Sequence, residues 1–246
     1  MSGLVVKNLT GGYGAYPVLH DVSFEVPAGK LVALIGLNGA GKSTTIKHIT
    51  GLLPKMQGEI TIDDESLATN NQKYRQSFGY IPETPSLYET LTLKEHIQMT
   101  ALAYDLDLDE ALKRAEPLLK TFRLADKLDF LPVHFSKGMK QKVMILCAFL
   151  IEPKLYIIDE PFLGLDPLAI DDLLQLMLAM KKQGAAILMS THILATAEKF
   201  CDEFVVLDQG QVIATGTLQE LQHQFAMPDA TLDEIYLALT KKGGQA

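Results

Sequence analysis

Apolar residues in this chain gather into short runs, separated by longer segments that mix apolar and polar positions. The run Leu31–Ile35 is apolar throughout, which is typical of a strand buried on both faces of a sheet. The strands that we expect are Gly3–Asn8, Val18–Val26, Leu31–Ile35, Gly58–Asp63, Phe78–Ile81, Leu155–Ile158, Ala185–Ser190, Phe204–Asp208 and Gln211–Ala214.

The longer segments predict helices. Thr92, with Glu95 three residues later, forms a capping box at one helix start, whereas Pro117 lies inside another helix and is expected to kink or break it. The helices that we expect are Ser43–Thr50, Asn70–Ser77, Thr92–Ala103, Asp109–Arg123, a long helix beginning after Ser136, Leu168–Lys182, Thr217–Gln224 and Leu232–Thr240.

This order of elements predicts an α/β fold with a helical insertion. The chain has 246 residues, 48% of them hydrophobic, which suffices for a large buried core. No convincing strand falls in the middle region. We expect a single domain over residues 1–246, with a core at about 1–82 and 150–225, a helical subdomain at about 83–149 and a C-terminal helical tail at about 226–246.

The charge balance narrows the classes of partner. The 22 basic residues are outnumbered by 30 acidic ones, which gives a net charge of −8. Proteins with a broad nucleic-acid footprint need a basic face, so we expect no nucleic-acid partner, although a local basic patch remains compatible with this composition.

Nothing in the sequence predicts a membrane segment. The longest apolar run, Val143–Ile151, is too short to span a bilayer, and the first residues carry neither a signal peptide nor a lipidation motif. Cys147 and Cys201 are far apart and match no metal-binding spacing, as expected for ordinary thiols in a reducing compartment. We therefore expect a cytosolic chain that reaches a membrane only through a partner.

One segment carries a specific chemical signal. Gly36–Thr44, GLNGAGKST, fits the phosphate-loop pattern G-x-x-x-x-G-K-[ST] and lies between a predicted strand and a predicted helix. Its small residues let backbone N–H groups approach a phosphate, and the helix N-terminus adds a partial positive charge. Lys42 would reach the terminal phosphates and the Ser43 hydroxyl would bind Mg²⁺. The alternative is a Gly-rich turn, but with this flanking context we predict a nucleoside triphosphate site.

Two later strands end in polar residues that suit such a site. Asp159 and Glu160 directly follow the apolar run Leu155–Ile158. In a phosphate-loop protein, Asp159 would stand beside Ser43 around Mg²⁺ and Glu160 would face the attacking water. His192 follows the next strand along the chain, so it should reach the same ligand-binding edge of the sheet.

Two further features are ambiguous when taken alone. Tyr13, in the turn-rich segment GGYGAYP, either stacks on a base or is an ordinary surface-turn residue. Ser136 is placed to cap a helix, which would leave the N–H groups of Lys137, Gly138 and Met139 free to meet an anion, as at any capped helix.

Together these motifs resemble, over nearly the whole chain, the nucleotide-binding subunit of ATP-binding-cassette (ABC) transporters. GLNGAGKST resembles the family's Walker A motif, LYIIDEP its Walker B motif with catalytic Glu160, GLDP its D-loop with Asp166, and STH its switch histidine, His192. NLTGGYG places Tyr13 where the family's adenine-stacking aromatic stands. The resemblance implies a phosphate-loop NTPase (RecA-like) core with an N-terminal antiparallel β-subdomain and an inserted α-helical subdomain.

The resemblance also implies a role for each site residue. Nucleotide binding would involve Tyr13, Gly36, Leu37, Asn38, Gly39, Ala40, Gly41, Lys42, Ser43, Thr44 and Glu83. The metal would be held by Ser43, Glu83 and Asp159, and catalysis would involve Glu160, His192 and Lys42. A second chain would supply its signature turn, Ser136, Lys137, Gly138 and Met139.

The sequence departs from the family pattern at two places. Glu83 stands where most members have Gln, so it still offers an oxygen ligand but adds negative charge near the phosphates. In FSKGMKQ, Lys137 and Met139 replace a Gly and a Gln of the signature LSGGQ, while Ser136 and Gly138 match it. These departures put the metal affinity and the rate of turnover in doubt, but not the phosphate contact.

The family resemblance implies an ATPase that acts in pairs. Two copies would pack head to tail around two ATP molecules with Mg²⁺, and hydrolysis would reopen the pair and move a separate polytopic membrane subunit on the cytoplasmic side of the membrane. The strings HFSKGMKQKVMI, STHILATAE and LDEIYLALT resemble the Ecs-type branch, which serves export-type membrane subunits. In the loop PETPSLYETL, Leu87, Tyr88 and Leu91 are equally consistent with docking to that subunit and with simple packing.

Other functions remain open at this stage. An importer ATPase is possible because transport direction lies mainly in the membrane subunit. A soluble ABC ATPase acting on nucleic acid or protein assembly usually carries coiled-coil or zinc insertions or a second cassette, and none is visible. A regulatory module with turnover impaired by Glu83 is disfavoured by Glu160 and His192. The transported substrate is not specified by these residues.

Overall fold

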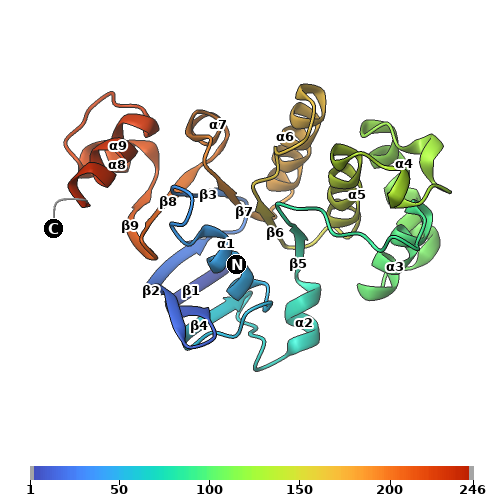
Figure 1. Ribbon diagram of the computed structural model, residues 1–246, viewed down its shortest axis with the longest axis horizontal. Coiled ribbons are helices and arrows are strands. Elements are labelled where there is room, and N and C mark those ends of the chain that lie inside the picture. Colours follow the sequence, from blue (N-terminus) through green and yellow to red (C-terminus); the bar gives the residue numbers. More distant parts are fainter. Residues whose placement is uncertain (1–2, 244–246) are drawn as a thin grey trace.

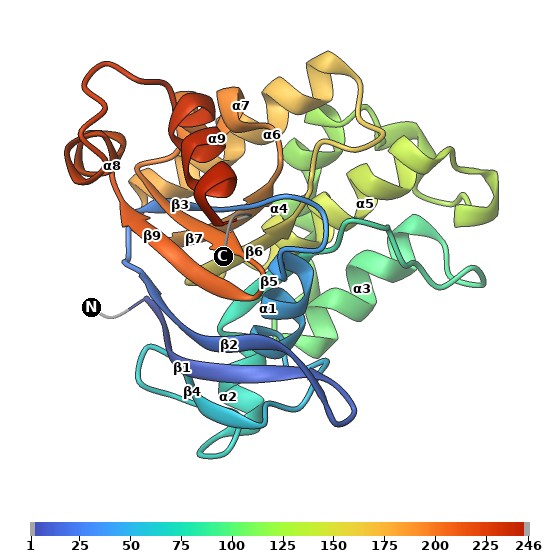
Figure 2. The ribbon, with the colours of Figure 1, turned by 60° about the vertical axis from the view of Figure 1, so that its left-hand side comes forward.

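Two β-sheets organise the fold of residues 3–243, the part that the computed structural model describes (Figures 1 and 2). The larger sheet has the strand order β5-β6-β7-β3-β8-β9, and all of its neighbouring pairs are parallel except β8 and β9. Its strands are β3 (Leu31–Ile35), β5 (Phe78–Ile81), β6 (Leu155–Asp159), β7 (Ala186–Thr191), β8 (Glu203–Asp208) and β9 (Gln211–Gly216). The predicted strands of this sheet agree closely with the observed ones.

The smaller sheet is antiparallel and has the order β2-β1-β4. Its strands are β1 (Leu4–Tyr13), β2 (Tyr16–Val26) and β4 (Gln57–Ile62). The predicted end of the first strand at Asn8 was wrong, because pairing continues through register shifts as far as Tyr13 opposite Tyr16. Glycines tolerate such irregular pairing, so a segment that reads as a loop forms the end of a hairpin.

Nine α-helices connect and cover the sheets within the described residues. They are α1 (Lys42–Ile49), α2 (Asn71–Gln76), α3 (Leu93–Ala103), α4 (Leu108–Thr121), α5 (Lys137–Leu150), α6 (Pro167–Lys182), α7 (Leu194–Phe200), α8 (Leu218–Gln224) and α9 (Leu232–Gly243). Short 3-10 helices lie at Ala125–Lys127 and Pro132–His134. The predicted helices are all present.

Two helices differ from the sequence prediction. α7 was not predicted; it begins without a side-chain cap and packs Leu194 and Ala197 against the sheet, so tertiary contact rather than local signal stabilises it. α4 continues through Pro117, which neither begins nor ends it, so the predicted break was wrong. The capping box of Thr92 and Glu95 at the start of α3 is present as predicted.

Both faces of the larger sheet are covered. Val32 and Leu34 of β3 belong to a core cluster that includes α1 and the smaller sheet, and Figure 2 shows α1 between the two sheets. On the opposite face, Leu31 packs with the cluster of α3 to α6, and Ala33 and Ile35 pack with α7, α8 and α9. The alternation of side chains along β3 therefore places the strand, and the loop that follows it, between two packed layers.

The segment between β5 and β6 contains helices and no strand. Figure 1 shows α3, α4 and α5 together at one end of the molecule, with α8 and α9 at the other end. The division into core, helical subdomain and tail stays a prediction.

A close approach between β1 and α1 gives a testable constraint on this layer. A Cβ added to Gly11 would lie 2.5 Å from Nε2 of His48, which is buried and whose Nδ1 lies 3.1 Å from the Leu53 carbonyl oxygen. We expect Gly11→Ala to lower the free energy of unfolding by about 1–3 kcal/mol in urea denaturation. In a His48→Ala background the overlap is gone, so the same substitution should cost much less; an equal cost would contradict this explanation.

Candidate functional site

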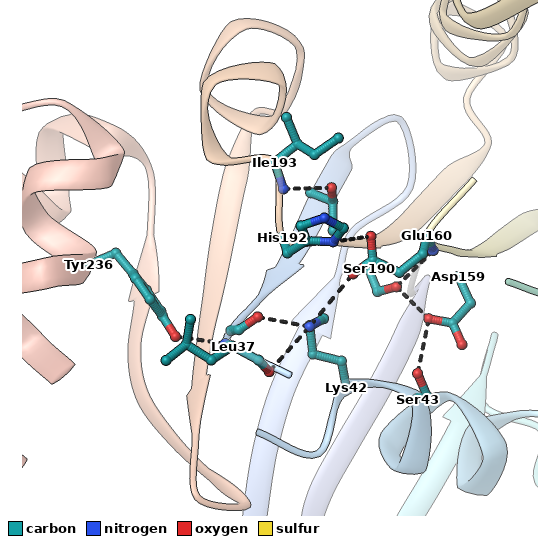
Figure 3. Close-up of polar contacts among 11 residues, drawn as sticks. Leu37, Lys42, Ser43, Asp159, Glu160, Ser190, His192, Ile193 and Tyr236 are labelled. Atoms are coloured by element: carbon teal, nitrogen blue, oxygen red, sulfur yellow. Dashed lines mark hydrogen bonds and ion pairs between the residues drawn. The ribbon is translucent and has the colours of Figure 1, made fainter. Parts of the chain in front are cut away.

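The ends of three neighbouring strands, β3, β7 and β6, lie level with one another. In the parallel ladders Ile35 pairs with Thr191, and Asp159 pairs with Ser190. The segments that follow these strands therefore meet at one edge of the sheet, where open α/β sheets bind ligands. They are the phosphate loop after β3, Glu160 after β6 and His192 after β7 (Figure 3).

The phosphate loop turns directly into α1. Gly41 precedes the helix with φ of 110°, and a Cβ there would lie 2.8 Å from a methyl group of Leu19, so both conformation and space favour glycine. The Lys42 side chain folds back over the loop, where Nζ donates to the Gly36 carbonyl at 2.7 Å and to the Leu37 carbonyl at 3.4 Å. The loop's own carbonyl groups thus hold the ammonium group.

Glu160 is held at both carboxylate oxygens. Oε1 lies 3.6 Å from Lys42 Nζ, and Oε2 lies 2.9 Å from His192 Nδ1 (Figure 3). The backbone of Glu160 has φ of 46°, a left-handed conformation that is unfavourable for this residue. Its N–H donates to the carbonyl oxygen of Ser190 at 3.2 Å and to the Ser190 hydroxyl at 3.1 Å. This strained turn brings the carboxylate beside the phosphate loop.

Asp159 lies beside Ser43, as predicted. Its Oδ1 accepts hydrogen bonds from the Ser43 hydroxyl at 3.3 Å and from the Ser190 hydroxyl. Burial raises the pKa of the Asp159 carboxyl above its ordinary value of 3.8; the two hydroxyl bonds lower it, and the Glu83 and Glu160 carboxylates raise it. The net effect raises the pKa, so the surroundings of Asp159 disfavour its ionised form.

The oxygen atoms at this point suit a hard divalent cation. Mg²⁺ prefers oxygen ligands and usually takes one or two from the protein, with the others from water and substrate phosphates. The Ser43 hydroxyl and the Asp159 carboxylate provide two adjacent oxygens, and a cation there would offset the repulsion among Asp159, Glu83 and Glu160. Within residues 3–243, no group of three or more His, Cys, Asp or Glu side chains is arranged to hold a metal.

An open pocket of about 680 Å³ lies over the phosphate loop. The predicted site residues that line it are Tyr13, Leu37, Asn38, Gly39, Gly41, Lys42, Ser43, Thr44, Glu83, Glu160 and His192. Gly36, Ala40 and Asp159 do not line it, since Gly36 uses its carbonyl to hold Lys42 and Ala40 and Asp159 are buried. The fold thus brings segments from Tyr13 to His192 together around one opening.

Tyr13 stands at the mouth of this pocket. It is the last residue of β1 and is 47% exposed. Lys47 of α1 donates to its hydroxyl at 3.2 Å, and the ammonium group lies 5.4 Å from the ring centroid. Hydrogen bonds from Thr44 and then Lys47 lower the pKa of Tyr13 below its ordinary value of 10.0. Side chains of the phosphate-binding helix therefore fix the ring while leaving it open to solvent.

The signature turn lies outside this pocket. None of Ser136, Lys137, Gly138 and Met139 lines it. Ser136 does cap α5, but its hydroxyl accepts the N–H of Met139 at 3.2 Å. The prediction that this N–H is free to meet an anion was therefore wrong, because the cap uses it.

The predicted D-loop packs against the signature turn. A Cβ added to Gly138 would lie 2.4 Å from the carbonyl oxygen of Gly164, so the two backbones touch. Lys142 of α5 donates to Asp166 at 2.8 Å, and the other carboxylate oxygen of Asp166 caps α6. The two motifs therefore form one connected surface separate from the phosphate loop.

Three side chains near the site had no role in the sequence prediction. Ser190 connects Asp159 to the backbone of Glu160, and its only signal is its place in the STH string. Lys47 holds Tyr13. The hydroxyl of Tyr236, from α9, accepts the N–H of Leu37 at 2.7 Å, and no local pattern indicates that a residue so distant in sequence reaches the phosphate loop.

Comparison with known proteins identifies the family. The family profile described as ABC transporter matches residues 19–163. The ABC-type transporter ATP-binding protein EcsA of Bacillus subtilis (strain 168) is 60% identical over 242 residues, with 98% of each chain covered. The chain therefore belongs to the ABC transporter family and is an ATP-binding subunit whose ATP hydrolysis is coupled to transport. The resemblance to this family and its Ecs-type branch is confirmed.

Solved structures confirm the fold class. A structure described as the ATP binding subunit of an ABC transporter has a TM-score of 0.95 and 59% identity, covering 97% of this chain and 100% of the other. A bacterial Atm1-family ABC exporter with ATP bound has a TM-score of 0.81 and 25% identity, covering 97% of this chain and 42% of the other. Among the described helices, none has the length and apolar character needed to cross a bilayer.

The raised pKa of Asp159 makes the site a source of instability. Its folded-state pKa lies above the unfolded value, so the folded protein binds more protons in the window above about pH 3.8, and the free energy of unfolding falls as the pH rises through that window. At pH 7.5, on the alkaline side of 3.8, the wild type carries this loss, whereas Asp159→Asn has no carboxyl group to titrate and does not. We expect this variant, in EDTA without nucleotide, to have the higher urea midpoint.

ATP with Mg²⁺ should reverse that order, because ligand binding stabilises the folded state and the variant has lost a cation ligand. Asp129→Asn, which changes an exposed carboxylate, serves as the control and should leave the midpoint unchanged in both conditions. A lower midpoint of Asp159→Asn in EDTA would contradict the proposed cost of this charge.

Proposed function

We propose that the chain is one half of a head-to-tail pair that closes on two ATP molecules with Mg²⁺ and drives a separate, export-type membrane subunit from the cytoplasmic side. The observation that carries this proposal is the placement of Glu160. Its carboxylate lies between Lys42 and His192 at the level edge of the parallel strands, beside the pocket over the phosphate loop. A carboxylate so placed suits a water molecule attacking a terminal phosphate.

Each of these pocket residues has a separate role in the proposed hydrolysis. Lys42 leaves the Gly36 carbonyl and Glu160 to neutralise the β- and γ-phosphates, which frees the Glu160 carboxylate to accept a proton from the attacking water. His192, on the other oxygen of Glu160, turns to the γ-phosphate. Tyr13 offers its open ring to the adenine. These roles use only side chains that the structure places around one opening.

Ser43, Asp159 and Glu83 are the proposed metal ligands. Mg²⁺ bound there would supply positive charge to the β- and γ-phosphate oxygens. Ser43 and Asp159 are adjacent, and Glu83 lines the same pocket and acts electrostatically on Asp159. Glu83 therefore adds a negative charge beside Asp159 and Glu160 where most of the family has a neutral amide, which should strengthen attraction of the cation in this subunit.

The pair explains the position of the signature turn. Ser136 and Gly138 lie outside the chain's own pocket, at the surface formed with the D-loop. In a two-fold pair each chain offers the same surface to the other, so the turn of one chain can meet the phosphates held by its partner. Lys137 would bring a positive charge to the same place. Asp166, bonded to Lys142, would keep the D-loop in register with the turn.

The membrane partner is proposed to dock near the loop after β5. Tyr88 in this loop is 62% exposed, whereas Leu87 is partly buried against the core cluster of the helices, so Tyr88 is the better docking residue and Leu87 serves packing. The export direction is supported by the likeness to the Atm1-family exporter. An importer remains the alternative, since both kinds of transporter use this fold.

Glu160→Gln tests the catalytic assignment. The amide keeps the shape of the side chain but cannot accept the proton, so we expect ATP turnover to fall at least about a hundredfold while ATP binding persists and a closed dimer accumulates. Turnover by phosphate release and mass by light scattering measure both effects. Glu116→Gln, an exposed carboxylate on α4, is the control. Wild-type turnover in Glu160→Gln would remove this residue from its role.

Affinity purification from detergent-solubilised membranes tests the partner. We expect the tagged chain to recover one polytopic protein in equal stoichiometry, with an ATPase activity that Glu160→Gln abolishes. A recovered subunit similar to those of exporters supports the direction, and one similar to those of importers contradicts it. Recovery of soluble proteins alone, with active ATPase, would refute the membrane-coupled part of the proposal.

A further inference from the structure

The phosphate loop receives a hydrogen bond partner from the far end of the chain. Tyr236, in the second turn of α9, accepts the N–H of Leu37 on its hydroxyl at 2.7 Å (Figure 3). Leu37 is the second residue of the loop, and 199 positions in sequence separate the two partners. The string LDEIYLALT contains Tyr236, but nothing in it indicates a contact with the phosphate loop, which arises only through the fold.

Tyr236 and Lys42 together bind both polar ends of a single peptide unit. The N–H of Leu37 and the carbonyl of Gly36 belong to the same peptide bond, and that carbonyl accepts a hydrogen bond from Lys42 at 2.7 Å. Both polar ends of this planar unit are therefore occupied, one by α9 and one by the first residue of α1. Rotation of the unit, which would redirect the start of the loop, requires breaking both bonds.

α9 is anchored firmly enough to serve as a support. Tyr236 is 5% exposed and packs with Ile235 and Leu232 in the core cluster that also contains Ile35 of β3. At the start of the helix, the N–H of Leu232 donates to Glu198 of α7 at 2.6 Å. Thus α9 connects the phosphate loop to the helix that directly follows His192.

Of the two hydrogen bonds to the peptide unit, only the one from Lys42 breaks during the proposed reaction. When Lys42 turns to the phosphates of a bound nucleotide, the Gly36 carbonyl loses its partner. The bond to Tyr236 lies on the opposite end of the unit and needs no change. From then on α9 supplies the remaining hydrogen bond that fixes the orientation of this peptide.

We propose that Tyr236 is a positioning residue that holds the first peptide of the phosphate loop in its nucleotide-binding orientation. Without the hydroxyl, the loop samples other orientations of this peptide, and binding must then order it again, which reduces affinity. Since a bound loop is correctly placed for chemistry, the effect falls on ATP binding rather than on the chemical step. This inference rests on the proposed function of the phosphate loop.

Tyr236→Phe tests the proposal, because it removes one hydroxyl and keeps the packed ring. Loss of the hydrogen bond to Leu37 predicts a rise of about three- to tenfold in the Kd and KM for ATP, with kcat within about twofold of wild type. Titration calorimetry with ATP and Mg²⁺ gives Kd, phosphate release gives KM and kcat, and thermal unfolding of the nucleotide-free protein reports on folding.

Tyr104→Phe is the matched control. The Tyr104 hydroxyl also bonds a backbone group, donating to the carbonyl of Phe78 at 2.9 Å, but it lies outside the nucleotide pocket. We expect this variant to keep the wild-type Kd for ATP. A Kd for Tyr236→Phe within twofold of wild type, a lower unfolding temperature with unchanged Kd, or an equal rise in Tyr104→Phe would each overturn the proposal.

Lys42→Ala separates failure of this inference from failure of the proposed function. If Lys42→Ala loses ATP binding while Tyr236→Phe binds as tightly as wild type, the phosphate loop is the nucleotide site and only the role of Tyr236 is refuted. If Lys42→Ala binds ATP as tightly as wild type, both are refuted. Loss of binding in Lys42→Ala together with the predicted rise in Tyr236→Phe supports both.

Discussion

The parallel register of β6, β7 and β3 is the constraint on which the rest of this site depends. Because Asp159 stands opposite Ser190 and Ile35 stands opposite Thr191, three strands deliver their following residues to the same level. Hydrogen bonding fixes the register of a parallel ladder, and a slip by one residue would turn every side chain to the other face. Ser190 uses this alignment directly, since it bonds both Asp159 and the backbone of Glu160.

Charge balance explains the arrangement of side chains within the site. Three carboxylates, Asp159, Glu160 and Glu83, lie near one another. Burial of Asp159 and repulsion from the other two carboxylates both oppose the ionisation of Asp159. Lys42 and His192 lie against Glu160 and give its carboxylate a cation and a hydrogen-bond partner. The same groups are those that a nucleotide and a cation would engage, so binding exchanges one set of charge partners for another. A site of this kind gives up folding stability for function.

Support for the phosphate loop comes from several layers of the fold. The smaller sheet and α1 pack on one face of β3, and α7, α8 and α9 pack on the other. Through Tyr236, the second of these layers contacts the loop directly. The signature turn and the D-loop, by contrast, contact each other through Gly138 and Gly164 and do not line the pocket.

The sequence alone determined the fold class, the order of the strands and of every helix but α7, the family and the position of the phosphate loop, because these follow from local patterns of apolar residues and from motifs with fixed spacing. It did not determine the extension of β1 to Tyr13, the helix α7 or the continuity of α4 through Pro117, where pairing and packing override local preference. Only the tertiary structure decided that Ser190 and Tyr236 reach the site. Contacts between residues far apart in sequence, such as those of Ser190 and Tyr236, have no local signature, because they arise from the alignment of strands and the docking of helices rather than from neighbouring residues.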